Sequence, residues 1–290
     1  MGVSAMEKFC DLHVHSNFSD GTFTPTQIVD MAKDLGLSAI ALTDHNTSDG
    51  LCEFMNAAKK ENVTAVAGVE FSADFKGIEL HILGLFIPQE HFLTVTKLMV
   101  ESQRRKDMSN RELIASLCRA GIVLDYDEIK AKTPNGQVNR AHIAAALMQK
   151  GYTSSVKEGF EKYLSPDGEH YKRPARMSAA EIIDFILSIG ALPVLAHPLV
   201  TLDKKGLLDF LGSPQSKGLC GMECYYSAYD DATTKTALDI AKAHGLICSG
   251  GSDFHGTAKP DIKLAFGKGE LRVPFECYTE LKEALDVKQS

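Results

Sequence analysis

Two histidines and an aspartate stand close together in the segment CDLHVHSNFSDG, which covers residues 10–21. His13 and His15 are two positions apart, and Asp20 follows five residues later. Successive side chains of a strand point to opposite faces, so both imidazoles would lie on one face, with Cα atoms roughly 6.5–7 Å apart. Two imidazoles at that spacing can bind one metal ion. The alternative is that one histidine is buried and hydrogen-bonded while the other faces water.

Other short apolar runs of the chain also carry side chains that bind metals. These are Asp44 and His45 in IALTDHN, Glu70 at the end of AVAGVEFS, His81 in the following run, His197 in PVLAHP, and Asp253 and His255 in ICSGGSDFHG. Buried carboxylates that face several imidazoles need a counter-charge, which bound cations supply. These side chains offer nitrogen and oxygen but no thiolate, which suits Mn, Fe or Zn. We therefore expect a centre with two to three divalent ions.

The elements that would position these side chains alternate between apolar runs and helical patterns. The run FCDLHVH is followed by TPTQIVDMAKDLG, in which Thr24 can cap a helix that starts at Pro25. The run ELHILGLFI is expected to pair with the preceding strand across FKG. Alternating strands and helices predict a barrel-like sheet, with its active site at the carboxyl ends of the strands. We expect residues 1–100 and 174–290 to form this barrel domain, and residues 101–173 to form a helical insertion.

The composition is that of an ordinary globular protein, with 44% hydrophobic and 24% charged residues among 290. No stretch approaches the roughly 20 apolar residues of a membrane helix, and the first residues contain no apolar signal region. We therefore expect a cytoplasmic protein without a membrane contact. The net charge of −7 argues against a general nucleic-acid coat. Residues 101–175, however, hold 13 basic and 10 acidic residues, a balance of +3.

Six motifs in order, DLHVHSNFSDG, ALTDHN, GVEFS, ELHILGL, AHP and GSDFHG, resemble those of PHP (polymerase and histidinol phosphatase) phosphoesterases. The resemblance covers essentially the whole chain. It is closest to the branch with a helical insertion, which includes 3′,5′-nucleoside bisphosphate phosphatases and 5′-3′ exoribonucleases. It implies an α/β fold, a distorted (β/α)7 barrel of PHP type with a small helical insertion domain, and a trinuclear metal centre.

The resemblance also implies which residues hold each ion. The implied sets are His13, His15, Glu70 and Asp253 for the first ion, Asp20, His45 and His255 for the second, and Glu70, as a bridge, with His81 and His197 for the third. Some family members have histidine where Asp20 stands. The carboxylate of Asp20 lowers the net positive charge of the metal centre, so the identity of the metal stays open among Mn, Fe and Zn.

The expected reaction is hydrolysis of phosphomonoesters of small nucleotides, such as 3′,5′-nucleoside bisphosphates, with short RNA 5′ ends as further substrates. Ions of this kind make hydroxide available at neutral pH for attack on phosphorus. Glu70, Asp44 and His255 are the predicted catalytic residues. Glu70 would bridge two ions, and His255 would lie near the leaving group. Asp44 would orient an imidazole, with direct acid–base chemistry as the alternative.

The insertion is expected to govern the choice of substrate. Arg140 and His142 lie at a predicted helix start, and Lys172 lies in YKRP, where the insertion rejoins the barrel. We expect these three residues to contact a second phosphate or the rim of the substrate. The alternative is a structural arginine and solvent-facing lysines. The tyrosines of MECYYSAYD (residues 222–230) are expected to pack in the core, with stacking on a base as the alternative.

Three other functions stay open at this point. The first is histidinol-phosphate phosphatase, against which the basic insertion argues mildly. The second is a metal-binding regulatory module without turnover, against which the full set of ligands argues. The third is C–N hydrolysis by a metal-dependent amidohydrolase, which the absence of a plausible bridging lysine disfavours. No obligate protein partner is expected.

Overall fold

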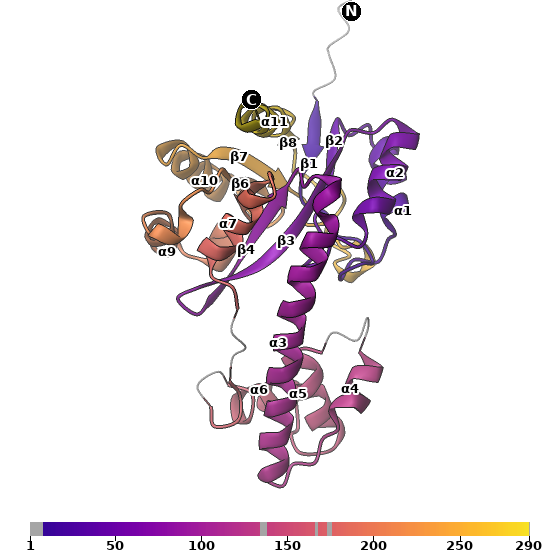
Figure 1. The fold of residues 1–290 in the computed structure, drawn as a ribbon, viewed down its shortest axis with the longest axis vertical. Coiled ribbons are helices and arrows are strands. Elements are labelled where there is room, and N and C mark those ends of the chain that lie inside the picture. Colours follow the sequence, from indigo (N-terminus) through magenta and orange to yellow (C-terminus); the bar gives the residue numbers. More distant parts are fainter. Residues whose placement is uncertain (1–7, 134–137, 166–167, 173–175, 290) are drawn as a thin grey trace, which may run out of the picture. The chain divides into compact units, whose positions relative to one another are not determined.

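The computed structural model describes residues 8–133, 138–165, 168–172 and 176–289 (Figure 1). The chain divides into two compact units, a barrel unit of Met1–Thr96 with Met177–Ser290 and an insertion unit of Lys97–Arg176. All seven cysteines are free thiols. In the described parts of the chain, no helix combines the length and the apolar character needed to cross a membrane.

The barrel unit contains a sheet with the strand order β7-β6-β5-β4-β3-β2-β1-β8. Its strands are β1 (Phe9–Asp11), β2 (Ala39–Leu42), β3 (Ala65–Phe75), β4 (Ile78–Leu85), β5 (Leu192–Leu195), β6 (Gly221–Tyr226), β7 (Ile247–Gly251) and β8 (Val273–Pro274). The sheet nearly closes on itself, because Val14 forms a parallel bridge with Phe254 and the Leu12 N–H donates to the Gly250 carbonyl at 3.1 Å. The predicted distorted α/β barrel is confirmed.

The strands run parallel apart from β4 and β8. β4 forms a hairpin with β3 through Lys76 and Gly77, whose φ angles are 52° and 81°. Two positive φ angles in a two-residue loop are typical of a type I′ turn, which matches the twist of paired strands. β3 continues to Phe75, so Glu70 lies within the strand and not at its end as predicted. Since β4 runs backwards, its first half, with His81, lies at the edge where the parallel strands end.

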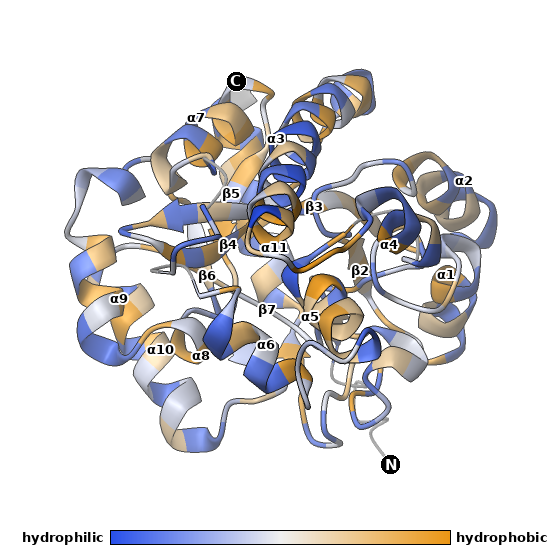
Figure 2. Ribbon diagram, turned by 90° about the horizontal axis from the view of Figure 1, so that it is seen from below, coloured by the Kyte–Doolittle hydropathy of each residue, from blue (hydrophilic) through white to orange (hydrophobic). Residues whose placement is uncertain are grey.

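Helices surround the strands of the barrel unit, as Figure 2 shows for α1, α2, α7, α9 and α10. The helix predicted after Thr24 is confirmed, because α1 starts at Pro25 and the Thr24 side chain accepts a hydrogen bond from the Gln27 N–H. The helical elements of this unit are α1 (Pro25–Asp34), α2 (Leu51–Glu61), η1 (Gln89–His91), α7 (Ala179–Ser188), α8 (Pro198–Thr201), α9 (Lys204–Leu211), η3 (Pro214–Ser216), α10 (Asp231–Ala243), η4 (Gly256–Ala258) and α11 (Glu276–Gln289).

The insertion unit is helical and covers Lys97–Arg176, where the sequence analysis places an insertion over residues 101–173. α3 (Phe92–Arg119) begins in the barrel unit and continues into the insertion unit, which also contains α4 (Tyr126–Lys132), α5 (Arg140–Gln149) and α6 (Val156–Lys162). These helices enclose a small core of their own, whose fully buried members include Leu117, Val138, Ile143, Leu147 and Leu164. The insertion unit therefore has a hydrophobic core separate from that of the barrel unit.

Candidate metal centre

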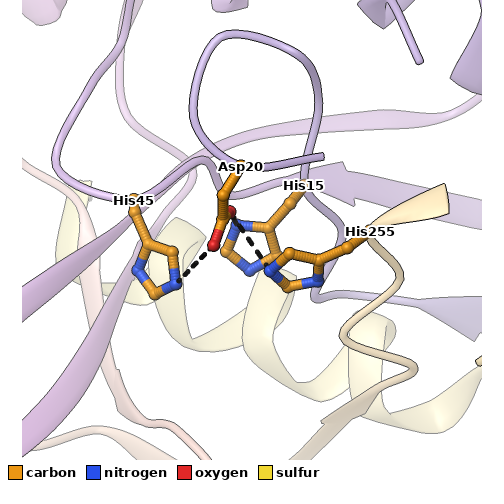
Figure 3. A group of neighbouring side chains, drawn as sticks. All are labelled: His15, Asp20, His45 and His255. Carbon is orange, nitrogen blue, oxygen red and sulfur yellow. Dashed lines mark ion pairs between the residues drawn. The ribbon is translucent and has the colours of Figure 1, made fainter. Parts of the chain in front are cut away.

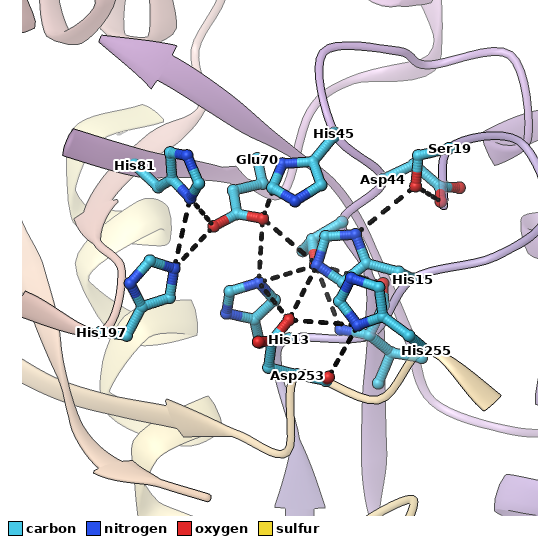
Figure 4. Close-up of polar contacts among 12 residues, drawn as sticks. His13, His15, Ser19, Asp44, His45, Glu70, His81, His197, Asp253 and His255 are labelled. Carbon is cyan, nitrogen blue, oxygen red and sulfur yellow. Dashed lines mark hydrogen bonds and ion pairs between the residues drawn. The ribbon is translucent and has the colours of Figure 1, made fainter. Parts of the chain in front are cut away.

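All nine predicted metal ligands lie together at one edge of the barrel (Figures 3 and 4). Six of them come directly after parallel strands: His13, His15, His45, His197, Asp253 and His255. The reversed strand β4 brings His81 to the same edge. A Cβ on Gly251 would lie 2.3 Å from the Cβ of His13. Glycine at this position therefore lets β7 approach the first pair of histidines.

A first cluster consists of His13, His15, Glu70 and Asp253. Nε2 of His13 lies 3.0 Å from Nε2 of His15, and each of these atoms lies 3.2 Å from Oε2 of Glu70. Oδ1 of Asp253 is 3.2 Å from Nε2 of His15 and 3.6 Å from Nε2 of His13. Both histidines are fully buried. Four donor atoms thus face one small volume inside the protein.

A second cluster, drawn in Figure 3, consists of His15, Asp20, His45 and His255. Asp20 is central to it, with Oδ1 at 3.1 Å from Nε2 of His255 and 3.6 Å from Nδ1 of His15. Its other oxygen is 3.9 Å from Nε2 of His45. The Asp20 side chain is 55% exposed and that of His45 27%. The second cluster is therefore the side of the centre that water and a substrate can reach.

A third cluster consists of Glu70, His45, His81 and His197. Oε1 of Glu70 lies 2.8 Å from Nδ1 of His81 and 2.9 Å from Nε2 of His197. Oε2 of Glu70 lies 3.0 Å from Nδ1 of His45. Glu70 consequently joins the third cluster to the first, with one oxygen directed to His81 and His197 and the other to His13 and His15 (Figure 4).

The donor atoms of the first cluster fit a metal ion better than a network of hydrogen bonds. A carboxylate next to Nδ1 of His13 holds the ring proton there, so Nε2 keeps a lone pair. Oε2 of Glu70 is buried and has no hydrogen-bond partner, although three imidazole nitrogens lie within 3.2 Å. Ligands of one ion with bonds near 2.0–2.3 Å lie roughly 3–3.5 Å apart. The observed spacing therefore fits a divalent cation.

The pKa values of the cluster residues reflect the same crowding of charge. Burial alone would lower the pKa of His15, but the nearby carboxylates of Asp253 and Glu70 raise it to about 9. Burial lowers the pKa of His45 to about 4. Burial disfavours ionised Asp20, yet the neighbouring imidazoles hold its pKa well below its usual range. Metal ligands must be deprotonated, so metal uptake is expected to release protons.

Comparison with known proteins identifies the family. Residues 11–171 match the family model described as PHP domain. The chain belongs to the PHP domain family. It is similar to the 3′,5′-nucleoside bisphosphate phosphatase of Chromobacterium violaceum, with 34% identity over 253 residues that cover 84% of this chain and 86% of that protein. It is also similar to the 5′-3′ exoribonuclease of Haemophilus influenzae, with 32% identity over 251 residues that cover 86% and 91% of the two chains.

A solved structure supports the same family. The chain superposes with a TM-score of 0.69 and 26% sequence identity on a protein from Bifidobacterium adolescentis assigned as a metal-dependent phosphoesterase. The likeness covers 94% of this chain and 95% of that one. Family membership and the ligand clusters together make this chain a metal-dependent phosphoester hydrolase, the enzyme class that the sequence predicts.

Glu223 on β6 is a buried carboxylate that the sequence reasoning missed. Oε1 lies 3.0 Å from Nδ1 of His13, and Oε2 accepts a hydrogen bond from the His197 backbone N–H at 2.6 Å. It thereby fixes the ring orientation of His13 and holds the backbone of His197, whose φ of 29° is rare for a residue with a side chain. One charged residue inside the apolar run GMECYY is the signal that could have revealed it.

The substitution Glu223→Gln is expected to weaken metal binding about 10- to 100-fold, because an amide has one acceptor oxygen and cannot accept from both His13 Nδ1 and the His197 N–H. Elemental analysis after dialysis against buffered metal would measure this loss, and circular dichroism would show that the fold is kept. Glu90→Gln, which removes an exposed carboxylate, is the control. Equal metal content in the two variants and the wild type would contradict the expectation.

Asp44 holds the loop between His15 and Asp20. Its buried carboxylate accepts hydrogen bonds from the Ser16 N–H at 2.7 Å, from the Ser16 hydroxyl at 2.6 Å and from the Ser19 hydroxyl at 2.6 Å. The Ser19 hydroxyl lies 3.5 Å from Nδ1 of His15 (Figure 4). The imidazole that Asp44 helps to orient is therefore that of His15, through Ser19, and not that of the adjacent residue in the chain.

Asp11 and Tyr226 support Asp253. The Asp11 carboxylate accepts hydrogen bonds from the backbone N–H and the hydroxyl of Ser252 and from the Ala265 N–H. Burial raises the pKa of Asp11 to about 6. The Tyr226 hydroxyl donates to Oδ2 of Asp253 at 2.8 Å. Tyr226 thus binds a ligand residue through its polar end, a role that neither core packing nor base stacking describes.

The predicted substrate contacts lie in the insertion unit, where the structure gives two of them local partners. α5 starts at Arg140, as predicted. The Arg140 guanidinium donates to the Leu164 carbonyl at 3.1 Å and stacks 4.7 Å above the ring of Tyr171. His142 completes the N-terminal cap of the same helix through Nδ1. Lys172 is exposed. Contact of these residues with a substrate stays a prediction.

Proposed function

We propose that this PHP domain hydrolyses phosphomonoesters of small nucleotides, such as 3′,5′-nucleoside bisphosphates, and also acts on the 5′ ends of short RNA. The single observation that carries the proposal is Glu70, whose two oxygens face different ligand clusters. This arrangement suits a phosphate held between neighbouring ions. The relatives named as a bisphosphate phosphatase and an exoribonuclease support the nucleotide as the substrate class.

In this proposal the centre holds two to three divalent ions, Mn, Fe or Zn. Three groups of ligands lie close together and share His15, His45 and Glu70 between them, which supports the higher number. Bound there, such ions would lower the pKa of water and neutralise charge on the phosphate. The nitrogen and oxygen donors, with an anionic Asp20 in the exposed cluster, suit all three metals.

The side chains of the centre would divide the remaining work. Glu70 keeps two clusters at a fixed separation. Asp44 is a positioning residue, because its two oxygens are occupied by the loop that carries Asp20. His255 would act as a ligand, since Nδ1 donates to the Asp253 carbonyl at 2.8 Å and Nε2 faces Asp20. In the insertion, Arg140, His142 and Lys172 would bind the part of the substrate that is not cleaved.

The test is phosphate release by protein reconstituted separately with Mn²⁺, Fe²⁺ and Zn²⁺. The panel contains a 3′,5′-nucleoside bisphosphate, a mononucleotide, histidinol phosphate and a 5′-phosphorylated oligoribonucleotide. We expect the highest kcat/KM for the bisphosphate. A higher value for histidinol phosphate would replace the proposed substrate with the amino-alcohol phosphate. If none of these four compounds releases phosphate at full metal loading, the result would favour a metal-binding regulatory module.

A further inference from the structure

Lys259 brings a positive charge to the edge of the metal centre. Its Nζ lies 2.8 Å from Oδ2 of Asp253, whose other oxygen lies 3.2 Å from Nε2 of His15 in the first cluster. The Lys259 side chain is 44% exposed, so the ammonium faces both a ligand carboxylate and solvent. We propose that Lys259 binds a non-bridging oxygen of the substrate phosphate, an inference that rests on the proposed phosphoester hydrolysis at this site.

Asp253 does not depend on Lys259 for its own hydrogen bonding. Oδ1 of Asp253 faces the first cluster, and Oδ2 already accepts a hydrogen bond from the Tyr226 hydroxyl at 2.8 Å. Tyr226 is the last residue of β6, which is paired with β5 on one side and β7 on the other. A lysine added to a carboxylate that is already satisfied indicates a function beyond support of that carboxylate.

The backbone that carries Lys259 is held in place. Gly256 has a φ of 66°, and a Cβ there would lie 2.1 Å from Oγ1 of Thr22. The same hydroxyl oxygen accepts a hydrogen bond from the Thr257 N–H at 2.9 Å, and the Lys259 N–H donates to the Gly256 carbonyl at 3.3 Å. Lys259 therefore extends from a loop packed against the segment before α1, and its reach toward the centre is set by the fold.

The ammonium group of Lys259 is suited to binding an anion. Within the described residues, Asp253 is the one acceptor of its ammonium, which has three N–H donors. Divalent ions in the first cluster would repel a lysine at this position, and they would also share the negative charge of Asp253. A phosphate monoester carries the additional negative charge and presents oxygen acceptors, and lysine binds phosphate as a point charge.

The test compares Lys259→Met with Lys263→Met in protein reconstituted with metal. Lys263 is an exposed lysine of the same loop and serves as the matched control. Isothermal titration with inorganic phosphate would measure the Kd, and elemental analysis of the same samples would measure metal content. We expect Lys259→Met to raise the phosphate Kd about 10- to 100-fold, the effect of one charge-assisted hydrogen bond. We expect unchanged metal content in both variants and partial recovery in Lys259→Arg.

Two results would overturn this role for Lys259. One is an unchanged phosphate Kd in Lys259→Met. The other is a loss of metal together with phosphate affinity, which would assign Lys259 to holding Asp253 in place. Inorganic phosphate is the probe, so the result does not depend on which ester is the substrate. If nucleotides fail in the activity panel while phosphate binding still depends on Lys259, the substrate is wrong and this inference stands.

Discussion

Glu70→Gln is expected to lower kcat about 10³-fold or more in a protein that still folds. One oxygen of Glu70 lies 2.8 Å from His81 and 2.9 Å from His197, and the other lies 3.2 Å from both His13 and His15. Glutamine offers a single acceptor oxygen, and its amide group would direct N–H donors at one of the two clusters. The link between the clusters, and with it metal binding on one side, is lost.

Steady-state kinetics and metal content measured on the same preparation would test this expectation. Glu79→Gln is the matched control, because Glu79 is a partly exposed carboxylate whose Oε1 lies 3.9 Å from Nε2 of His81. We expect the control to stay within about threefold of the wild type. Activity of Glu70→Gln within about tenfold of the wild type, at full metal content, would exclude a bridging function for this carboxylate.

Removal of metal with a chelator is expected to abolish hydrolysis and to lower the Tm by roughly 8 °C or more. The centre gathers nine ionisable side chains, most of them buried, and cations that bind only the folded state stabilise it by mass action. Each site saturated at about a thousand times its Kd contributes about 4 kcal/mol. Differential scanning fluorimetry before and after reloading with Mn²⁺ or Zn²⁺ would measure the shift.

Elemental analysis completes the metal experiment. After anaerobic reloading, we expect two to three divalent ions per chain and full recovery of activity. A protein that melts at the same temperature with and without metal would show that the clusters are held by hydrogen bonds instead. Fewer than two ions per molecule would contradict the shared-ligand centre itself.

Much of the centre could be predicted because parallel strands end at one edge of a barrel. A short apolar run followed by a histidine or aspartate was enough to identify His45, His197 and Asp253 as neighbours. The same rule does not place the two ligands of the hairpin. Glu70 lies within β3, and His81 lies in the first half of a reversed strand. The residues FKG suggested the hairpin, but the length of β3 depends on pairing with β4 over eight positions.

The supporting side chains were harder to predict, because their partners are distant in the sequence. Glu223 contacts a histidine 210 positions away, and the charged residue in GMECYY does not by itself indicate that partner. Asp44 was expected to orient an imidazole. It reaches that of His15 only through the hydroxyl of Ser19, which lies on another loop. Arg140 was expected to contact a second phosphate or the rim of the substrate, which stays a prediction, and its stacking on Tyr171 depends on how the insertion unit packs.

The seam between β1 and β7 brings together ligands from opposite ends of the chain. The first cluster joins His13, made early in translation, to Asp253, made late, and the Asp253 N–H donates to the His13 carbonyl across that seam. A nascent chain that still lacks β7 has neither the carboxylate nor the strand beside the first histidines. The first cluster is therefore complete only when the last parallel strand has closed against the first one.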